Sequence, residues 1–438
     1  MTYNSAVRRR DFFATAFAAA LPAQQVPALA KPPAANGKLK ITDVEIWRVE
    51  GRRPPPEVDH RQSFSRPAHI YDELHPRSRR PPPGSDGKPF PTSALYIKIR
   101  TDAGVDGFSG PVFSNVCSIV DQSLRPFLIG KDPLAGEALW DQMYRMQPHS
   151  QGQYMMALSA VDNVLWDLRG RYFGVPVYRL LGGPTRKSVE AYASCIDLST
   201  KPGELPALAR HYQQEGFRYE KWFLPYGPAD GPEGLRKNIE MLRILRETLG
   251  EDGAFMLDAW MSWDLSYAIE FVQQAEKHRP RWLEEAFLPA DMQSFVDLRK
   301  RSRIPIASGE HFYGRWTAGD YLRAGALDVL QTDPDWCGGI TELLKICAIA
   351  SQYNVQVIPH GDCLHPSLHV IAAQSPHTCP LLEYMVNRLH SGRWKYYFEK
   401  NPLLPERGRF ALPERPGFGI ELDEGRVEKR TRVRWSWS

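Results

Sequence analysis

Residues 254–258 read Ala-Phe-Met-Leu-Asp, a short apolar run that ends in a carboxylate. A run of this kind suits a β-strand that is buried on both faces, as the strands of a parallel sheet are. Similar runs recur on both sides of it, separated by helical stretches such as 235–249 and 340–351. We therefore expect strands near residues 189–194, 217–223, 254–258, 281–285, 304–309, 327–332, 355–359 and 381–384.

Eight strand-and-helix units in succession predict an α/β fold, a (β/α)8 barrel of the TIM type. The competing fold, a doubly wound open sheet, would need a glycine-rich phosphate turn after an early strand, and the sequence has none. Upstream, residues 39–49 and 94–100 alternate as strands do, and 154–173 carries apolar residues at helical spacing. A smaller α+β domain therefore precedes the barrel.

The composition excludes several classes of protein. Of 438 residues, 42% are hydrophobic and 24% are charged, which excludes a mainly disordered chain. A net charge of +4 without a basic stripe argues against a nucleic-acid partner. The sequence contains no run of 18 apolar residues, so we expect no membrane span. None of the six cysteines forms a Cys-x-x-Cys pair, which argues against a zinc knuckle and a dense disulfide framework.

The first thirty residues have the order of an export signal. Residues 8–13, Arg-Arg-Arg-Asp-Phe-Phe, precede an apolar run at 14–20 and an A-x-A cleavage site at 28–30. The arginine pair Arg9-Arg10 resembles a twin-arginine signal. We expect residues 1–30 to be a signal peptide and the protein to be periplasmic. The alternative is a basic, alanine-rich start without that role.

Ionisable residues end six consecutive strands of the predicted barrel. They are Asp258, Glu284, Glu310, Asp333, His360 and Glu383, at intervals of 26, 26, 23, 27 and 23 residues. In such a barrel the carboxyl ends of the strands form the mouth, where enzymes keep their active sites. One charged residue at a strand end is often only solvated, but six in register predict a functional site.

The three carboxylates Asp258, Glu284 and Glu310 predict a metal site. Like charges that converge raise one another's pKa unless a cation neutralises them. Oxygen ligands suit a hard cation, and Mg²⁺ is typical where a few carboxylates leave positions open for substrate. Glu285 follows Glu284, but alternation along a strand would point it the other way, so we expect a structural role for it.

Asp333 and His360 predict a general base. A carboxylate that binds one imidazole nitrogen fixes the tautomer and raises the basicity of the other nitrogen. The Gly-x-Ser-x-Gly motif of a serine nucleophile is absent, so we do not expect a nucleophilic triad.

Together with Glu383, these residues resemble the enolase superfamily and, within it, the mandelate racemase/muconate lactonizing enzyme family. Further matching motifs lie at 157–162, 165–168, 181–183, 336–341 and 416–420. The motifs around Asp258 and Glu310 resemble those of the rhamnonate dehydratases, in the acid-sugar dehydratase branch. The resemblance implies an N-terminal capping domain at 38–150, a barrel at 151–390 and a C-terminal segment, 391–438, that returns to the cap.

The second barrel strand departs from the family pattern. Members of the racemase type carry Lys-x-Lys there, with the second lysine as a base on the opposite face. Here Lys221 matches the first lysine, and Phe223 stands where the second would be. The resemblance therefore implies an enzyme without that second base, in which Lys221 supports the substrate carboxylate. The alternative is a surface lysine at a strand end.

Residues 51–91 carry ten prolines and seven arginines, which predicts a long irregular loop. In the family, loops of the first domain cover the barrel mouth and set specificity. The candidates here to bind a sugar-acid carboxylate or hydroxyls are His60, Arg61, His75 and Arg77, since an arginine fork suits a carboxylate. A solvated basic loop is the alternative for each of them.

The resemblance implies a Mg²⁺-dependent hydro-lyase that acts on a sugar acid. His360 would remove the C2 proton of an aldonate-type substrate to give an enediolate, and Glu383, if neutral, would donate a hydrogen bond to the carboxylate. Loss of the 3-hydroxyl would give a 2-keto-3-deoxy acid. An epimerase, racemase or cycloisomerase acting through the same enediolate is an alternative, as is a non-catalytic periplasmic sugar-acid binding protein. We expect a homo-oligomer.

Overall fold

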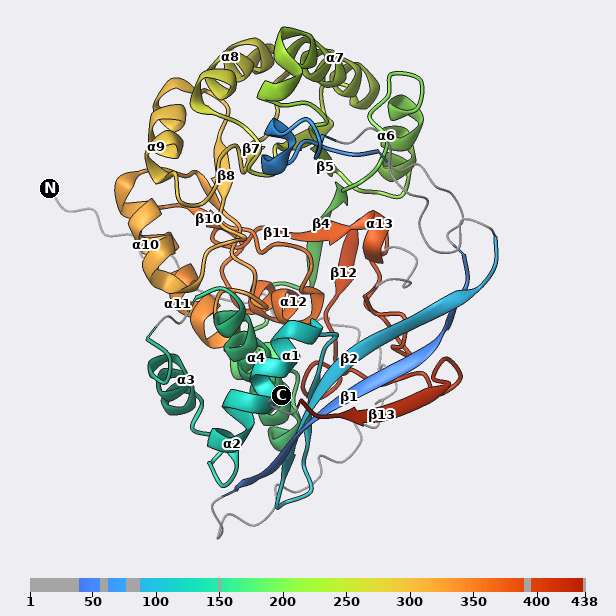
Figure 1. Ribbon diagram of the computed structural model, residues 1–438, viewed down its shortest axis with the longest axis vertical. Coiled ribbons are helices and arrows are strands. Elements are labelled where there is room, and N and C mark those ends of the chain that lie inside the picture. The colour runs from blue at the N-terminus through green and yellow to red at the C-terminus, as the bar shows by residue number, and fades with distance from the viewer. Residues whose placement is uncertain (1–38, 56–61, 76–86, 149–150, 390–394, 436–438) are drawn as a thin grey trace, which may run out of the picture. The chain divides into compact units, whose positions relative to one another are not determined.

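Four antiparallel strands from both ends of the chain form one sheet. The computed structural model describes residues 39–55, 62–75, 87–148, 151–389 and 395–435. The strands are β1 (Ile41–Arg53), β2 (Phe90–Thr101), β3 (Gly107–Ser109) and β13 (Lys429–Val433), in the order β13-β1-β2-β3. β13 pairs with β1, so the C-terminal segment completes this sheet, as expected (Figure 1).

Helices pack against this sheet and form a core with it, and we call the sheet and these helices the cap. They are α1 (Ser114–Ile119), the π-helical turn η2 (Val120–Leu124), α2 (Arg125–Leu128), α3 (Gly136–Arg145) and α4 (Gln153–Phe173). Buried residues of α4 from Met155 to Leu168 belong to the cap core. α4 ends at Gly174, whose φ of 68° lies in the left-handed region that glycine adopts without strain.

Eight parallel strands form the second sheet. They are β4 (Ser188–Cys195), β5 (Tyr219–Phe223), β6 (Ala254–Asp258), β7 (Leu283–Glu284), β8 (Ile306–Ser308), β9 (Val329–Leu330), β10 (Gln356–Val357) and β11 (Leu381–Met385). Each strand from β4 to β10 pairs with the next, and β11, the last in sequence, pairs with β4, so the sheet curls as in a barrel, although in the described residues no pairing joins its edge strands β10 and β11. β12 (Arg409–Ala411) adds an antiparallel strand beside β4.

Helices follow the strands along the chain and surround the curled sheet (Figure 1). The longer ones are α6 (Leu205–Gln214), α7 (Gly231–Leu249), α8 (Leu265–Ala275), α9 (Met292–Arg301), α10 (Gly314–Ala324), α11 (Gly339–Gln352) and α12 (Leu364–Ala373). Short helices are α5 (Val177–Leu180), α13 (Val386–Leu389) and the 3-10 turns η1 (Pro67–Ile70), η3 (Pro228–Asp230) and η4 (Glu276–His278). No described helix has the length and apolar character needed to span a membrane.

The eight predicted barrel strands are all present, which confirms the expected α/β barrel with an α+β cap. Several strands are shorter than predicted, and β7 consists of two residues. It ends at Glu284 because Glu285 has a φ of 45°, which is not an extended conformation. All six cysteines are free and buried, in agreement with the absence of a disulfide framework.

The predicted loop at 51–91 is shorter than its composition indicates. β1 continues to Arg53 and β2 begins at Phe90, and these two residues pair in register although prolines flank them. The Arg53 guanidinium lies 4.7 Å from the Phe90 ring centroid, a cation–π contact at the end of the hairpin. Farther along, the Ser65 N–H donates to the carbonyl of Leu224 at 3.0 Å, which places residues 62–66 beside the end of β5.

Cap helices hold the loop that follows β9. Trp140 Nε1 donates to the Gly338 carbonyl at 2.7 Å. Asp162 accepts the backbone N–H of Thr341 at 2.9 Å and its hydroxyl at 2.7 Å. Asn163 Nδ2 donates to the Pro334 carbonyl at 3.1 Å. The cap therefore fixes the loop next to the strand end that carries Asp333.

Candidate active site

Three of the strand-end carboxylates surround one lysine in the barrel mouth. Lys221 Nζ lies 3.1 Å from Asp258 Oδ2 and 2.9 Å from Glu383 Oε1, and it also contacts Glu284 Oε1. The four side chains are at most 1% exposed. Lys221 is therefore a buried ammonium group among carboxylates, which excludes the alternative of a surface lysine.

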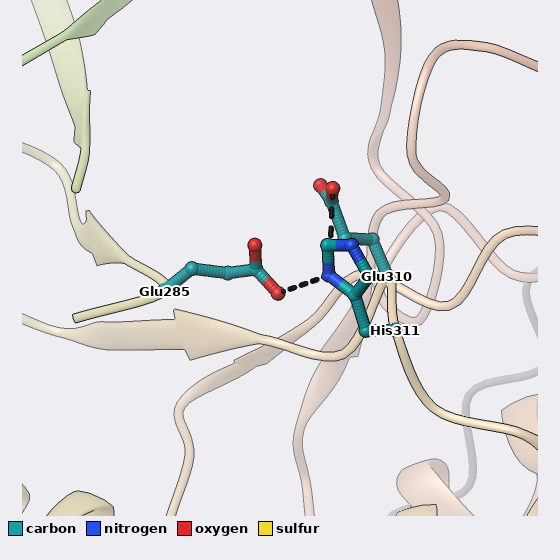
Figure 2. A group of neighbouring side chains, drawn as sticks. All are labelled: Glu285, Glu310 and His311. Carbon is teal, nitrogen blue, oxygen red and sulfur yellow. Dashed lines mark hydrogen bonds and ion pairs between the residues drawn. The ribbon is translucent and has the colours of Figure 1, made fainter. Parts of the chain in front are cut away.

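Glu310 lies beside two imidazole rings. Its Oε2 is 3.6 Å from His360 Nε2, and its Oε1 is 3.6 Å from His311 Nδ1. Glu285 Oε1 lies 2.9 Å from the same His311 nitrogen. Figure 2 shows both carboxylates directed at the His311 ring, and the donor atoms of the three side chains lie within 4.8 Å of one another.

The expectation that Glu285 points away from the mouth is wrong. It relied on the alternation of side chains along a strand, but β7 ends one residue earlier. With a φ of 45°, the backbone turns at Glu285 and brings its side chain to the same region as Glu310. Glu285 Oε2 is buried without a hydrogen-bond partner among the described residues.

The charges of this region fit a bound cation. Burial raises the pKa of Asp258, Glu284 and Glu310, and nearby carboxylates raise it further. Although burial opposes the charge on Lys221, Glu284 and Glu383 raise its pKa well above the usual value, so it stays protonated. Even with the imidazoles of His311 and His360 protonated, three positive charges face six carboxyl groups, those of Asp258, Glu284, Glu285, Glu310, Asp333 and Glu383. The oxygen donors and the unpaired Glu285 Oε2 therefore suit a hard divalent cation such as Mg²⁺.

Glu284 has two further partners that the sequence analysis did not identify as site residues. Its Oε2 accepts hydrogen bonds from Trp282 Nε1 at 2.9 Å and from Gln331 Nε2 at 2.7 Å. Gln331 is two residues before Asp333, and if the predicted strand over 327–332 continued to Asp333, alternation would put the two side chains on the same face, although β9 itself ends at Leu330. That spacing was the available signal for Gln331.

Asp333 and His360 form the predicted pair. Asp333 Oδ2 lies 2.7 Å from His360 Nδ1, and both side chains are buried. The Trp336 ring packs against the imidazole, with 5.1 Å between the ring centroids. Although burial disfavours the imidazolium, Glu310 and Asp333 raise the pKa of His360 to about 10. A cation held by Glu310 would offset its negative charge and favour the neutral imidazole.

Comparisons with known proteins agree with this geometry. The model of the mandelate racemase / muconate lactonizing enzyme N-terminal domain matches residues 83–182, and that of the enolase C-terminal domain-like family matches 204–426. The chain belongs to the mandelate racemase/muconate lactonizing enzyme family of the enolase superfamily. This confirms the resemblance inferred from the motifs.

Relatives of known activity within this family include dehydratases. An L-rhamnonate dehydratase of Saccharopolyspora erythraea is 37% identical over 339 residues, which cover 75% of this chain and 83% of that protein. The crystal structure of a rhamnonate dehydratase from Gibberella zeae complexed with Mg superposes with a TM-score of 0.76 at 30% identity, covering 88% of this chain and 94% of that one. These similarities identify the chain as an enzyme of the hydro-lyase class.

Another chemistry is represented among the similar structures of the superfamily. The 3,6-anhydro-D-galactonate cycloisomerase from Zobellia galactanivorans superposes with a TM-score of 0.70 at 25% identity, covering 89% of this chain and all of that one (100%). The shared fold therefore does not by itself select the reaction, and the residues of this chain have to be considered individually.

The family's second-lysine position is occupied by an apolar side chain. The Phe223 ring lies 5.0 Å from that of Phe64, and the Phe64 ring lies 5.5 Å from that of Trp260. Lys221 Nζ is 5.4 Å from the Phe223 ring. Among the residues that the structure describes, this side of the mouth is thus an aromatic wall, and the three rings offer no group to accept a proton.

Glu383 does not meet the condition attached to its predicted role, a neutral carboxyl group. Although burial opposes ionisation, Lys221 and His360 lower its pKa to about 2. Glu383 Oε2 accepts the backbone N–H of Gly361 at 2.8 Å. In this arrangement Glu383 is a carboxylate that accepts hydrogen bonds, so the expected donation to a substrate would require a change in its surroundings.

Only one of the four candidate residues of the capping loop lies within the described ranges. His75 Nε2 is 3.2 Å from Asp230 Oδ1, and its ring centroid is 5.3 Å from that of His69. These contacts hold His75 against η3. The other three candidates, His60, Arg61 and Arg77, lie outside the described residues.

Proposed function

We propose that this enzyme is a Mg²⁺-dependent sugar-acid dehydratase, which removes the C2 proton of an aldonate-type acid and eliminates the 3-hydroxyl to give a 2-keto-3-deoxy acid. The observation that carries the proposal is the buried Asp333–His360 pair, at 2.7 Å, beside the carboxylates of the mouth. The similarity to L-rhamnonate dehydratases supports the choice of an aldonate-type substrate.

Asp258, Glu284 and Glu310 would hold the cation, with Glu285 beside them. When bound, Mg²⁺ stabilises the negative charge that develops on the substrate carboxylate as the C2 proton leaves. Trp282 and Gln331 orient Glu284 by hydrogen bonds to its Oε2. Lys221, which stays protonated, offsets part of the charge and keeps Asp258, Glu284 and Glu383 close together.

His360 acts first as a base and then as an acid. Asp333 binds Nδ1 and keeps the proton on that nitrogen, so Nε2 can accept the C2 proton of the substrate. The same nitrogen then returns the proton to the 3-hydroxyl, which leaves as water. The enol that remains tautomerises to the 2-keto-3-deoxy acid, so substrate equals product plus one water.

The test is to incubate the protein and Mg²⁺ with a panel of aldonic and related sugar acids, and to follow products by mass spectrometry. The proposal predicts loss of one water and a 2-keto-3-deoxy product from at least one acid. A C2 epimer without mass change would favour an epimerase instead. A cyclised isomer without mass change would favour a cycloisomerase, for which the similarity to the Zobellia enzyme is the supporting observation. Tight binding of an acid without any conversion would favour a binding protein.

A further inference from the structure

We propose that Lys395 is a positioning residue for the proton-transferring pair, because it ties together the two loops that follow Asp333 and His360. The inference rests on the proposed function, in which this pair moves the C2 proton. Lys395 lies in the C-terminal segment, after the last barrel strand β11 (Leu381–Met385), and nothing in the strand-end pattern points to it.

One ammonium group bonds both loops. Lys395 Nζ lies 3.1 Å from Asp335 Oδ2, in the loop after β9, and 3.3 Å from Asp362 Oδ2, in the loop after β10. It also donates to the main-chain carbonyl of Asp362. The Lys395 side chain is only 15% exposed, so these contacts are largely shielded from water.

Both partners are two residues from the proton-transferring pair. Asp335 follows Asp333 and donates its backbone N–H to Asp333 Oδ1 at 2.6 Å, while the other oxygen of Asp333 binds His360. Asp362 follows His360 at the same spacing. A shift of either loop would therefore change the distance between Asp333 and His360.

Two uncharged side chains in the described part of the chain also bond these loops. Asn163 Nδ2 donates to Asp335 Oδ1 at 3.1 Å, which holds the first loop from α4 but supplies no charge. Tyr396, the next residue after Lys395, donates its hydroxyl to the Asp362 carbonyl at 3.4 Å and accepts the Leu364 N–H at 3.0 Å. Without Lys395, the carboxylates of Asp335 and Asp362 would lose the ammonium group that they share, and with it the contact that links the two loops.

The first experiment compares steady-state kinetics of Lys395→Met, Lys395→Arg and the parent. The methionine variant keeps most of the side-chain volume but cannot bond the carboxylates. We expect kcat to fall about 10–100-fold because a displacement of about 1 Å in a reacting group has an effect of that order, while KM changes by less than about threefold. Lys395→Arg keeps the charge and should recover most of kcat.

Lys98→Met is the matched control. Lys98 Nζ pairs with Asp106 Oδ2 at 2.9 Å in the cap sheet and, like Lys395, is partly shielded from water, but it bonds neither loop. Its kcat should stay near that of the parent. An equal loss of kcat in both methionine variants, or an unchanged kcat in Lys395→Met, would overturn the proposal.

Backbone hydrogen exchange tests the same idea without any substrate. In Lys395→Met, the amides of Asp335 and Gly361 should exchange faster, whereas those of β6 should be unchanged. Unchanged protection of the amides in both loops would refute the positioning role, whether or not the protein converts a sugar acid. A failure to convert any sugar acid would refute the proposed function separately. If Lys395→Met does not fold, Asp335→Asn replaces it, since this variant keeps the backbone N–H that bonds Asp333. It should show the same loss of kcat and the same faster exchange. Parental values of kcat and exchange would overturn the proposal.

Discussion

Glu284 carries the most contacts of the proposed metal ligands, since Lys221, Trp282 and Gln331 all donate to its two oxygens. These donors fix the carboxylate in one orientation, so that it need not be ordered when a cation binds. Replacing one oxygen by an amide nitrogen changes the charge and removes an acceptor with almost no change in shape. The position therefore tests the electrostatic argument with little risk to the fold.

Glu284→Gln should weaken Mg²⁺ binding at least tenfold, roughly the effect of losing a contact in a metal site, and abolish turnover. Isothermal titration calorimetry with MgCl₂ measures the affinity directly. Glu220→Gln is the control, because Glu220 is also buried in the barrel sheet but bonds Trp222 instead of the mouth residues. Parental Mg²⁺ affinity in Glu284→Gln would remove this residue from the ligand set.

At the scale of elements, the contact between α4 and α11 places the loop that follows Asp333. Gly339, the first residue of α11, has a φ of 79°, and a Cβ built on it would lie 2.6 Å from the Cβ of Asp162. Glycine is thus needed here both for the backbone conformation and for the close approach of the two helices.

Gly339→Ala should lower the free energy of unfolding by at least about 1 kcal/mol more than Gly182→Ala does. Gly182 also has a positive φ, 87°, but a Cβ there would meet nothing within 4 Å. Both variants carry the cost of a left-handed alanine, about 1–2 kcal/mol, and only the first adds a steric clash. Equal shifts of the urea midpoint in the two variants would contradict this account of the helix contact.

The spacing of apolar residues predicted the barrel, because a strand that is buried on both faces is recognisable from its own short apolar run. It also predicted the Asp333–His360 pair, because both residues end their strands at the same edge of the sheet. It missed the turn at Glu285, since a positive φ for a glutamate has no signal in a single sequence. It could not find the Lys395 contacts, because Asp335 and Asp362 are 60 and 33 residues away, and no local pattern links residues at such separations.

At the scale of the whole molecule, Glu220 links stability to pH. Burial raises the pKa of this carboxyl group to about 8, against a usual value of 4.5. Between these values the folded protein keeps a proton that the unfolded chain releases. The free energy of unfolding therefore falls as the pH rises from about 4.5 to 8.

Glu220→Gln should remove this part of the pH dependence, since an amide does not titrate. We expect the variant to match the parent near pH 5 and to exceed it near pH 8 by an amount on the order of 2–4 kcal/mol. Thermal unfolding at the two pH values measures the difference. If the difference in the free energy of unfolding between variant and parent is the same at the two pH values, Glu220 is ionised in the folded protein.

The export of the chain remains a prediction, because residues 1–38 lie outside the described ranges. We propose that Arg9 and Arg10 direct the folded protein to the periplasm. Replacing both with lysine should leave the protein in the cytoplasm, as measured by fractionation and immunoblotting. Equal amounts of variant and parent in the periplasm would contradict a twin-arginine signal.

The central claim is that His360, oriented by Asp333, removes the C2 proton of a sugar acid, while Phe223 occupies the position of the family's second lysine on the opposite side of the mouth. The most direct measurement is the entry of deuterium at C2 in deuterated water with Mg²⁺, for the parent and for His360→Asn. The account predicts that the variant loses both this exchange and dehydration while Mg²⁺ affinity is kept, since His360 is not a proposed ligand. Deuterium entering C2 at near the parental rate in His360→Asn would contradict the account and make Lys221 the first candidate for the base.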